Sequence, residues 1–127
     1  MSPLILTLDE VLAIHENQIA RYGGAPGIRD MGLLMSALSQ PVATFGGRFL
    51  HADVYEMAAA YLFHIVRNHP FADGNKRVGT VAALVFLALN DVDVKAPGDD
   101  LELLVLGVAQ GRTDKPAITA FLRDHAS

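Results

Sequence analysis

The sequence predicts an all-α fold, a compact bundle of about six helices forming a single domain over residues 1–127. Three observations support this prediction. Apolar residues recur at helical spacing in several stretches, helix caps and glycine or proline stops bracket those stretches, and the alternating pattern of strands is rare. At 127 residues, 51% of them hydrophobic, the chain suits one domain with a substantial core.

The first helix is predicted from Leu8 to about Tyr22. Thr7 and Glu10 form a capping box, in which the threonine hydroxyl accepts from a backbone N–H and the glutamate reaches back. Glycines at positions 23 and 24 end the helix. Five residues recur at helical spacing: Leu8, Val11, Leu12, His15 and Ile19. The four apolar residues among them form an apolar stripe along the helix.

A short second helix is predicted from Met31 to about Ser39. Asp30 is its N-cap, and Pro41 ends it. Met31 and Met35 are expected to pack in the core. The following stretch, residues 42–52, contains a glycine pair and has no clear period, so we expect a mobile loop there.

The third helix is predicted to begin after a second capping box, formed by Asp53 and Glu56. It should end near Asn68, because His69 precedes Pro70 and the residue before a proline is disfavoured in the α region. Its apolar stripe consists of Val54, Met57, Ala58, Tyr61, Leu62 and Ile65.

The fourth helix is predicted from about Asn75, after a turn over residues 71–74. Its body, residues 78–89, is apolar nearly all round. A helix of this kind belongs at the centre of an all-α domain, so we expect the bundle to be built around it.

Two further helices complete the predicted bundle. After a break over residues 90–97, which can hold a short extended piece, Asp99 and Glu102 form a third capping box for a helix that reaches about Gln110. Pro116 lies near the first turn of the last helix, which is capped by Thr113 or Asp114. Its docking residues are Ile118, Phe121 and Leu122.

The bulk composition excludes several classes of protein. A net charge of −4 argues against a non-specific nucleic-acid binder, so no direct DNA contact is expected. The absence of cysteine excludes disulfides and thiolate metal sites and fits a reducing cytoplasm. The N-terminal stretch lacks the features of a signal peptide, and the longest apolar run, residues 78–89, falls short of the roughly 20 residues that span a bilayer.

The stretch from His69 to Arg77 carries the most chemistry in the chain. A helix starting near Asn75 directs its free backbone N–H groups and its positive dipole end into this loop, and Gly74 permits close approach of an anion. Lys76 and Arg77 fall in the first helical turn, where cations are unfavourable unless an anion offsets them. The pattern predicts a phosphate site.

Three other side chains of this loop extend the prediction. Asp73 beside a phosphate is a natural Mg²⁺ ligand, and a neutral His69 can take a proton from an incoming hydroxyl. We expect Phe71 to anchor the loop in the core and Asn75 to brace the turn through its amide. The plain alternative is a polar turn over residues 72–75 with a helix cap, without chemistry.

The string from His69 to Arg77 resembles the signature of the Fic/Doc superfamily, and the resemblance extends over nearly the whole chain. Typical Fic enzymes have glycine where this chain has Lys76, and they transfer AMP from ATP to a protein hydroxyl. The death-on-curing toxins have lysine there and transfer the γ-phosphate of ATP to a threonine of elongation factor Tu. The Arg21–Gly24 segment also looks like these toxins, whereas Pro70 and Gly74 match the Fic version.

The resemblance implies a role for each residue of the string. His69 corresponds to the general base and Asp73 to the Mg²⁺ ligand. The phosphate-binding group of the ATP site corresponds to Gly74, Asn75, Lys76 and Arg77. Arg67 stands where the toxins also have an arginine, and its alternative role is that of a solvated cation at a helix end.

The resemblance also implies a partner, since these toxins are held inactive by an antitoxin whose helix lies in a groove. The inhibitory-helix pattern that many Fic enzymes carry is missing from this chain, so restraint is expected from a separate protein. Leu8, Val11 and Leu12, together with residues 42–52, are candidates for lining the groove. Two alternatives to the kinase toxin remain open: a Fic-type AMP transferase, and a catalytically inactive relative that binds a partner.

The remaining histidines show no metal-ligand pattern. His64 is expected to be half-buried or core-facing, and His15 and His51 are expected at the surface.

Overall fold

The computed structural model describes residues 2–127 and confirms the all-α prediction. Within these residues no helix is long and apolar enough to cross a membrane. The elements in chain order are α1 (Leu8–Tyr22), α2 (Met31–Ser39), β1 (Thr44–Phe45), β2 (Arg48–Phe49), α3 (Val54–Asn68), α4 (Asn75–Leu89), α5 (Gly98–Ala109) and α6 (Lys115–Asp124).

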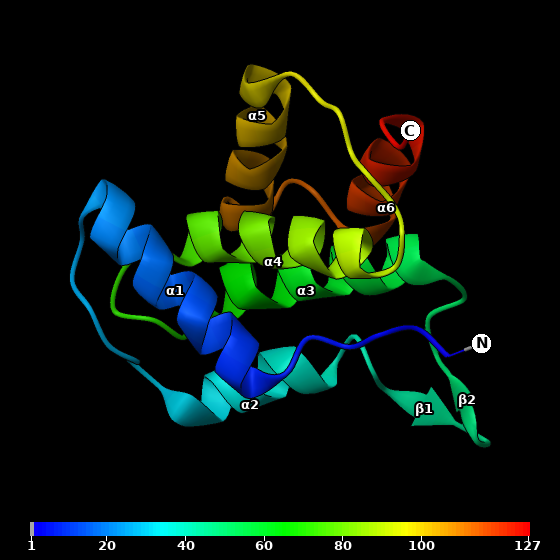
Figure 1. Ribbon diagram of the computed structural model, residues 1–127, viewed down its shortest axis with the longest axis horizontal. Helices are drawn as coiled ribbons and strands as arrows, with labels where there is room; N and C mark the ends of the chain where they lie inside the picture. Colours follow the sequence, from blue (N-terminus) through cyan, green and yellow to red (C-terminus); the bar gives the residue numbers. More distant parts are fainter. Residues whose placement is uncertain (1) are drawn as a thin grey trace.

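The centre of the bundle is a pair of helices, α3 and α4, rather than α4 alone. Figure 1 shows the two lying side by side, with α2 on one side and α5 and α6 on the other. Helix α3 contacts α2, α4, α5 and α6, whereas α4 contacts α1, α3 and α5. The alanines at positions 58–60 of α3 are completely buried, and small side chains there let its neighbours approach.

A glycine in α4 allows the central pair to pack closely. A Cβ atom added at Gly79 would lie 2.8 Å from Cγ2 of Val66 and 3.2 Å from the carbonyl oxygen of Leu62, both in α3. Only a residue without a side chain fits at this separation. The close contact between α3 and α4 fixes the two helix ends that flank the loop at residues 69–74.

The predicted helix caps are formed at most helices. Thr7 and Glu10 form the complete capping box of α1, and aspartates at positions 30 and 114 cap α2 and α6. In α3 only half of the predicted capping box is formed: Asp53 accepts from the backbone N–H of Glu56, and its second carboxylate oxygen pairs with Arg123 at 2.6 Å.

The predicted capping box of α5 is wrong. The helix begins at Gly98, directly after Pro97, and has no side-chain cap. Because the helix starts earlier than expected, Asp99 and Asp100 fall within its first turn. There they interact favourably with the positive end of the helix dipole instead of capping a backbone N–H.

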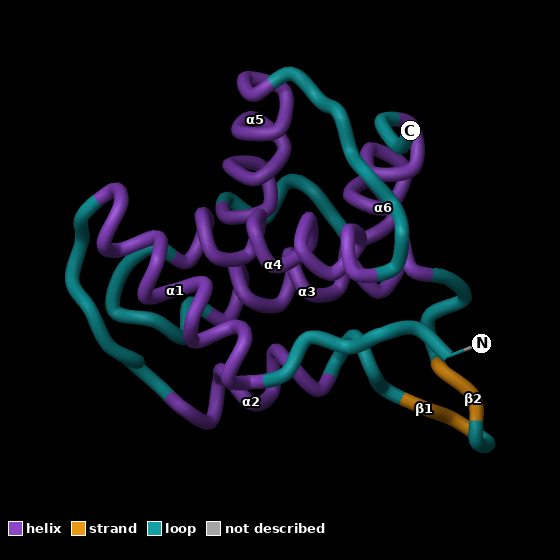
Figure 2. Tube along the Cα trace, in the orientation of Figure 1, coloured by secondary structure: helices purple, strands orange, loops and turns teal. Residues whose placement is uncertain are grey.

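The sequence suggested an irregular loop over residues 42–52, but these residues are not irregular throughout. They contain a short antiparallel hairpin that pairs Thr44 with Phe49 and Phe45 with Arg48, seen at one corner of the helical bundle in Figure 2. Gly46 and Gly47 form the turn, and both have positive φ, 62° and 80°. A two-residue turn of this kind needs positive φ at both positions, which a glycine pair supplies.

Met31 and Met35 do not pack in the core as expected, because they are 46% and 48% exposed. Helix α2 rests on α3 through a neighbouring face, where Leu34 and Ala37 are completely buried. With 3.6 residues per turn, the midpoint of Leu34 and Ala37 lies roughly a third of a turn around the helix from that of Met31 and Met35, so the methionines remain outside.

His64 is half-buried, as predicted, and links α3 to α6. Its Nε2 atom lies 3.1 Å from Nζ of Lys115, which also stands over the ring of Phe63. Burial lowers the pKa of His64 to about 4, and the positive charges of Lys115 and His51 act in the same direction. The neutral imidazole accepts a hydrogen bond from the lysine.

This histidine is expected to make folding sensitive to acid. An unfolded histidine binds its proton near pH 6.5, whereas His64 in the folded state binds it only near pH 4. The unfolded state therefore holds more protons between these values, and stability falls as the pH is lowered from 6.5 to 4. Partial exposure reduces the effect to about 1 kcal/mol.

Chemical denaturation at pH 7.5 and pH 4.5 measures this loss directly. The variant His64→Gln should lose less stability between the two pH values than the wild type, because it has no proton to bind. Equal losses in the two proteins would show that His64 does not contribute.

Candidate functional site

The loop between α3 and α4, residues 69–74, begins with an unusual backbone conformation. His69 has left the right-handed helix, as expected before Pro70, but it adopts the left-handed region with φ 53° and ψ 51°. A non-glycine residue in that region costs about 1–3 kcal/mol and needs support from its surroundings. Arg29 gives this support, donating from Nε to the carbonyl of His69 at 2.7 Å and from a terminal nitrogen to that of Asn68 at 3.1 Å.

The middle of the loop is closed by Asn75. Its side-chain oxygen accepts from the N–H of Phe71 at 2.9 Å, and its side-chain nitrogen donates to the carbonyl of the same residue at 3.1 Å. Asn75 is buried and Phe71 is completely buried, so both expectations for these residues are confirmed. Since both ends of the Asn75 amide are occupied by the backbone of Phe71, its side chain has little left to offer a ligand.

His15 supports the same loop from α1, and the prediction that it lies at the surface is wrong. It is only 6% exposed, and its ring stacks on Phe71 with centroids 4.0 Å apart. Its Nε2 atom lies 3.0 Å from the carbonyl oxygen of Asp73, to which a protonated Nε2 donates. The helical spacing of His15 with the apolar stripe was the signal that could have placed it inward. His51, also expected at the surface, is half-buried, with Nε2 3.2 Å from the carbonyl of Gln40.

The Asp73 carboxylate is exposed and held ionised. The backbone N–H of Ala25 donates to one oxygen at 3.3 Å and that of Gly74 to the other at 2.9 Å. These two bonds, the one from Ala25 foremost, lower the pKa of Asp73, and the charges of Arg77 and His69 act in the same direction. Each oxygen keeps a lone pair, so the carboxylate is free to bind a cation.

Gly24 lets the segment after α1 press against Asp73. Its φ is +117°, and a Cβ atom added there would lie 2.8 Å from Oδ2 of the aspartate. The segment continues along the loop, where Ile28 bridges to Phe71. Residues 23–29 therefore support the segment over residues 69–77 from outside.

The N-terminus of α4 has no side-chain cap, because Gly74 occupies the cap position with φ 81° and ψ 14°. The first turn also lacks acidic residues and carries Lys76, which is exposed, and Arg77. The Arg77 guanidinium donates to the carbonyl of Gly23 at 3.0 Å and stands 5.5 Å over the ring of Tyr22. An uncapped helix start with cations beside it is suited to bind an anion.

A cleft of about 390 Å³ opens at this point, and we name it the loop cleft. It brings together every residue that the sequence predicted for the site. Its lining residues are Val66, Arg67, His69, Asp73, Gly74, Asn75, Lys76, Arg77 and Ala109.

Arg67 at the rim of the loop cleft is more than a solvated cation. Its guanidinium donates to the carbonyls of Val108 and Ala109 at 3.4 and 3.3 Å, so it satisfies backbone groups at the C-terminal end of α5. Among the described residues no group of three or more histidine, cysteine, aspartate or glutamate side chains could hold a metal. A cation in the loop cleft would therefore depend on Asp73 and on oxygens of the bound ligand.

A second hollow, of about 650 Å³, adjoins the loop cleft and shares Lys76 and Arg77 with it. It lies between α1, α4 and α5, and we name it the α1/α4/α5 groove. Leu8, Val11 and Leu12, which the sequence suggested as groove residues, do not line it. Val11 is completely buried, and the two leucines pack against the core.

The geometry defines a small helical domain with a helix start suited to bind an anion, one ionised carboxylate and one exposed imidazole in the same cleft. The comparison with family models assigns this domain to a family, because residues 5–87 match the model described as the Fic/DOC family. The chain belongs to this family.

Two characterised relatives cover most of the chain. It is 34% identical over 115 residues to "Protein kinase doc" of Escherichia phage P1, which is 91% of this chain and 90% of the phage protein. It is 38% identical over 108 residues to "Toxin Doc" of Mycolicibacterium smegmatis, covering 84% of this chain and 83% of that protein.

The contact between Gly24 and Asp73 is expected to set the pKa of the carboxylate. In Gly24→Ala the added methyl group must displace Asp73, which weakens the hydrogen bond from Ala25 and raises the pKa of Asp73 toward its usual value. Titration of the side-chain carboxyl carbon by NMR measures the change.

Gly27→Ala is the matched control. Gly27 also has positive φ, +102°, but nothing lies within 4 Å of an added Cβ atom. Both variants bear the same kind of backbone strain, so only the contact with Asp73 distinguishes them. An equal pKa change in both would contradict the assigned role of Gly24.

Proposed function

We propose that the protein is the toxin of a toxin–antitoxin pair and that it transfers the γ-phosphate of ATP to a threonine hydroxyl of a protein target. Its membership of the Fic/DOC family and its similarity to relatives named as a kinase and a toxin support this proposal. The expected target is elongation factor Tu, whose modification would arrest translation.

Lys76 is the observation that carries the choice of reaction. It is exposed, sits in the first turn of α4 and lines both the loop cleft and the α1/α4/α5 groove. A long cation at this point adds charge where a glycine would leave space. It would shift the phosphates along the helix start and so expose a different phosphorus atom to attack.

The loop positions the groups that the transfer needs. The imidazole of His69, at the mouth of the loop cleft, takes the proton of the threonine hydroxyl. The hydroxyl oxygen then bonds to the γ-phosphorus, the bond between that phosphorus and the bridging oxygen breaks, and ADP leaves. Backbone N–H groups from Asn75 onward, with Lys76 and Arg77, neutralise the phosphate charge.

Asp73 is the residue that would hold Mg²⁺. Its carboxylate is exposed and ionised, and Mg²⁺ bound to nucleotides takes one or two carboxylates together with phosphate oxygens and water. When bound, the ion supplies charge neutralisation at the phosphates. Ala25 and Gly74 fix the orientation of the carboxylate through their backbone N–H groups.

An antitoxin is the partner that this function requires. Its helix is expected to cover an apolar surface of the toxin. On the hairpin segment, Phe45 is 83% and Leu50 is 65% exposed, so residues 42–52 remain a candidate for this contact. Leu8, Val11 and Leu12 of α1 are not proposed for this contact, because their side chains pack in or against the core.

AMP transfer is the second candidate function. Pro70 and Gly74 are the residues that typical Fic enzymes have at these positions, and the same base, carboxylate and anion site would serve that reaction. An inactive partner-binding relative is the third. It is disfavoured because His69, Asp73 and Arg77 all line one cleft.

ATP labelled separately on the α- and γ-phosphates distinguishes these functions with elongation factor Tu as the acceptor. We expect label from the γ position only, and a loss of transfer of at least a hundredfold in His69→Asn, because a positioned base contributes about 10²–10⁴-fold. Asparagine suits the left-handed backbone of position 69 better than alanine does.

His51→Ala is the control for this experiment, since His51 lies outside the loop cleft. It should keep full transfer. Label from the α position would establish AMP transfer instead, and full activity of His69→Asn would exclude His69 as the base.

Asp73→Asn tests the metal assignment. We expect turnover to fall by at least tenfold and its dependence on Mg²⁺ concentration to shift to higher values, because the amide is a poor ligand for the ion. Steady-state rates over a range of Mg²⁺ concentrations measure this. An unchanged Mg²⁺ dependence would remove Asp73 from the metal site.

A further inference from the structure

The segment that follows α1 binds the loop backbone without using its own side chains. The N–H groups of Arg29 and Asp30 both donate to the carbonyl of Pro70, at 2.7 and 3.0 Å. The N–H of Ala72 donates to the carbonyl of Gly27 at 3.1 Å. These bonds hold the loop from Pro70 onward, whatever side chain stands at position 29. Within residues 2–127, no backbone hydrogen bond joins this segment to the two residues before the proline.

The Arg29 side chain reaches those two residues instead. Its guanidinium donates from Nε to the carbonyl of His69 at 2.7 Å and from a terminal nitrogen to that of Asn68 at 3.1 Å. Both carbonyls lie at the C-terminal end of α3, where a helix leaves them without an internal partner and where its dipole favours a cation. Arg29 forms no ion pair with a carboxylate within residues 2–127, so the two carbonyls are its bonding partners.

His69 adopts a backbone conformation that two local rules disfavour. Its φ of 53° and ψ of 51° lie in the left-handed region, which few residues other than glycine enter. It also precedes Pro70, and a residue before proline favours the extended region. The residue is exposed, so burial of its side chain does not hold the backbone. The extended conformation is therefore the state that His69 would adopt without outside support.

The two bonds from Arg29 act on the φ and ψ angles of His69. The carbonyl of Asn68 belongs to the peptide plane before the Cα atom of His69, and the carbonyl of His69 belongs to the plane after it. Only φ and ψ of that residue are soft between the two planes. A planar guanidinium that binds both carbonyls therefore fixes the relative orientation of the planes. The bond from the N–H of His69 to the carbonyl of Ile65, at 3.2 Å, lies in the first plane and leaves both angles free.

The side chain of His69 follows this backbone. In the left-handed conformation His69 lines the loop cleft together with Asp73. Rotation toward the extended region would turn the bond from Cα to Cβ and move the imidazole relative to the cleft. Arg29 itself does not line the loop cleft, so it lies outside the space that a nucleotide would occupy there.

We propose that Arg29 is a positioning residue for the transfer reaction. Its guanidinium holds the backbone of His69 in the left-handed conformation that keeps the imidazole in the loop cleft. This inference rests on the proposed function and extends it to a residue outside the cleft. Arg29 acts through His69 and touches neither the nucleotide nor the acceptor hydroxyl.

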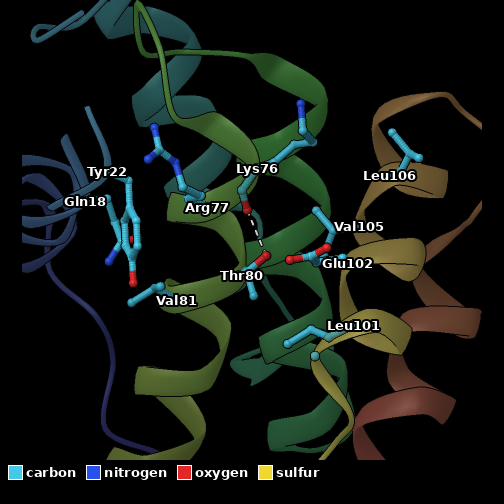
Figure 3. A pocket seen from close by; sticks show the side chains of 11 residues that line it. Gln18, Tyr22, Lys76, Arg77, Thr80, Val81, Leu101, Glu102, Val105 and Leu106 are labelled. Carbon is cyan, nitrogen blue, oxygen red and sulfur yellow. Dashed lines mark hydrogen bonds between the residues drawn. The ribbon is translucent and has the colours of Figure 1, made fainter. Parts of the chain in front are cut away.

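The phosphate-binding end of α4 is supported separately. Figure 3 shows Arg77 on the α1 side of α4, beside Tyr22. The guanidinium of Arg77 donates to the carbonyl of Gly23 at 3.0 Å, a contact that does not involve the Arg29 side chain. Loss of the Arg29 guanidinium should therefore affect the base and leave nucleotide binding intact.

Steady-state transfer from γ-labelled ATP to elongation factor Tu by the variant Arg29→Gln tests the proposal. The kcat value should fall about tenfold to a hundredfold, because a small misplacement of a catalytic group can cost about 10²-fold. KM for ATP should stay unchanged, because the phosphate site is held by other contacts. Arg29→Lys keeps the charge but not the planar pair of donors, so its kcat should be intermediate.

NMR measures the conformation of His69 without reference to activity. The chemical shifts of its Cα and Cβ carbons depend on φ and ψ. In the wild type they should have left-handed values, and in Arg29→Gln they should move toward extended values.

Arg123→Gln is the matched control, because Arg123 contacts the opposite end of the same helix. Its guanidinium pairs at 2.6 Å with Asp53, the N-cap of α3. Both variants remove an exposed arginine that contacts an end of α3, so both lose a contact of the same kind. Only Arg29→Gln should lose kcat.

The outcomes separate this proposal from the proposed function. Wild-type kcat in Arg29→Gln, or carbon shifts of His69 that do not change, would overturn the positioning role. An equal loss of kcat in Arg123→Gln would also overturn it, since the loss would then follow from a weaker α3. If the wild type transfers no labelled phosphate, the proposed function fails, and the carbon shifts of His69 alone decide whether Arg29 holds its backbone.

Discussion

The pair of hydrogen bonds between the Asn75 amide and the backbone of Phe71 is the constraint on which the site depends. It closes the loop between α3 and α4 from within the core, where an unmade bond would leave buried polar groups unsatisfied. Phe71 is fixed by burial and by the ring of His15. His69 and Asp73, which flank Phe71 in the loop, are consequently held in fixed positions at the surface.

The second constraint comes from the segment that follows α1. Arg29 holds the strained backbone of His69, Ala25 donates to Asp73, and the carbonyl of Gly23 orients Arg77. These contacts join residues at least 40 positions apart in the chain. Each of these three residues is thus positioned by a backbone group or an arginine from a different part of the sequence, which gives the candidate site rigidity that the loop alone would lack.

Much of the fold was predictable because it depends on local rules. Apolar spacing, caps and helix breakers together placed the helices of residues 2–127, although the cap predicted for α5 is wrong. The Gly23–Gly24 pair and Pro41 marked real ends. The errors have tertiary causes. Met31 and Met35 look like core residues, but the packing of α2 on α3 buries the neighbouring face instead. His15 looks like a surface residue, but its ring is buried by stacking on Phe71. The hairpin at residues 44–49 was too short to show a period.

The sequence by itself determined the helices, the start of α4 with its two cations and no acidic residue, and the composition of the loop, because capping, periodicity and charge act over a few residues. Only the tertiary structure decided that α3 shares the centre, that Gly24 presses on Asp73, and that the loop cleft opens into a groove beside Gln18. These features arise where helices distant in the chain come together. Their distances depend on how whole faces pack, which no local pattern encodes.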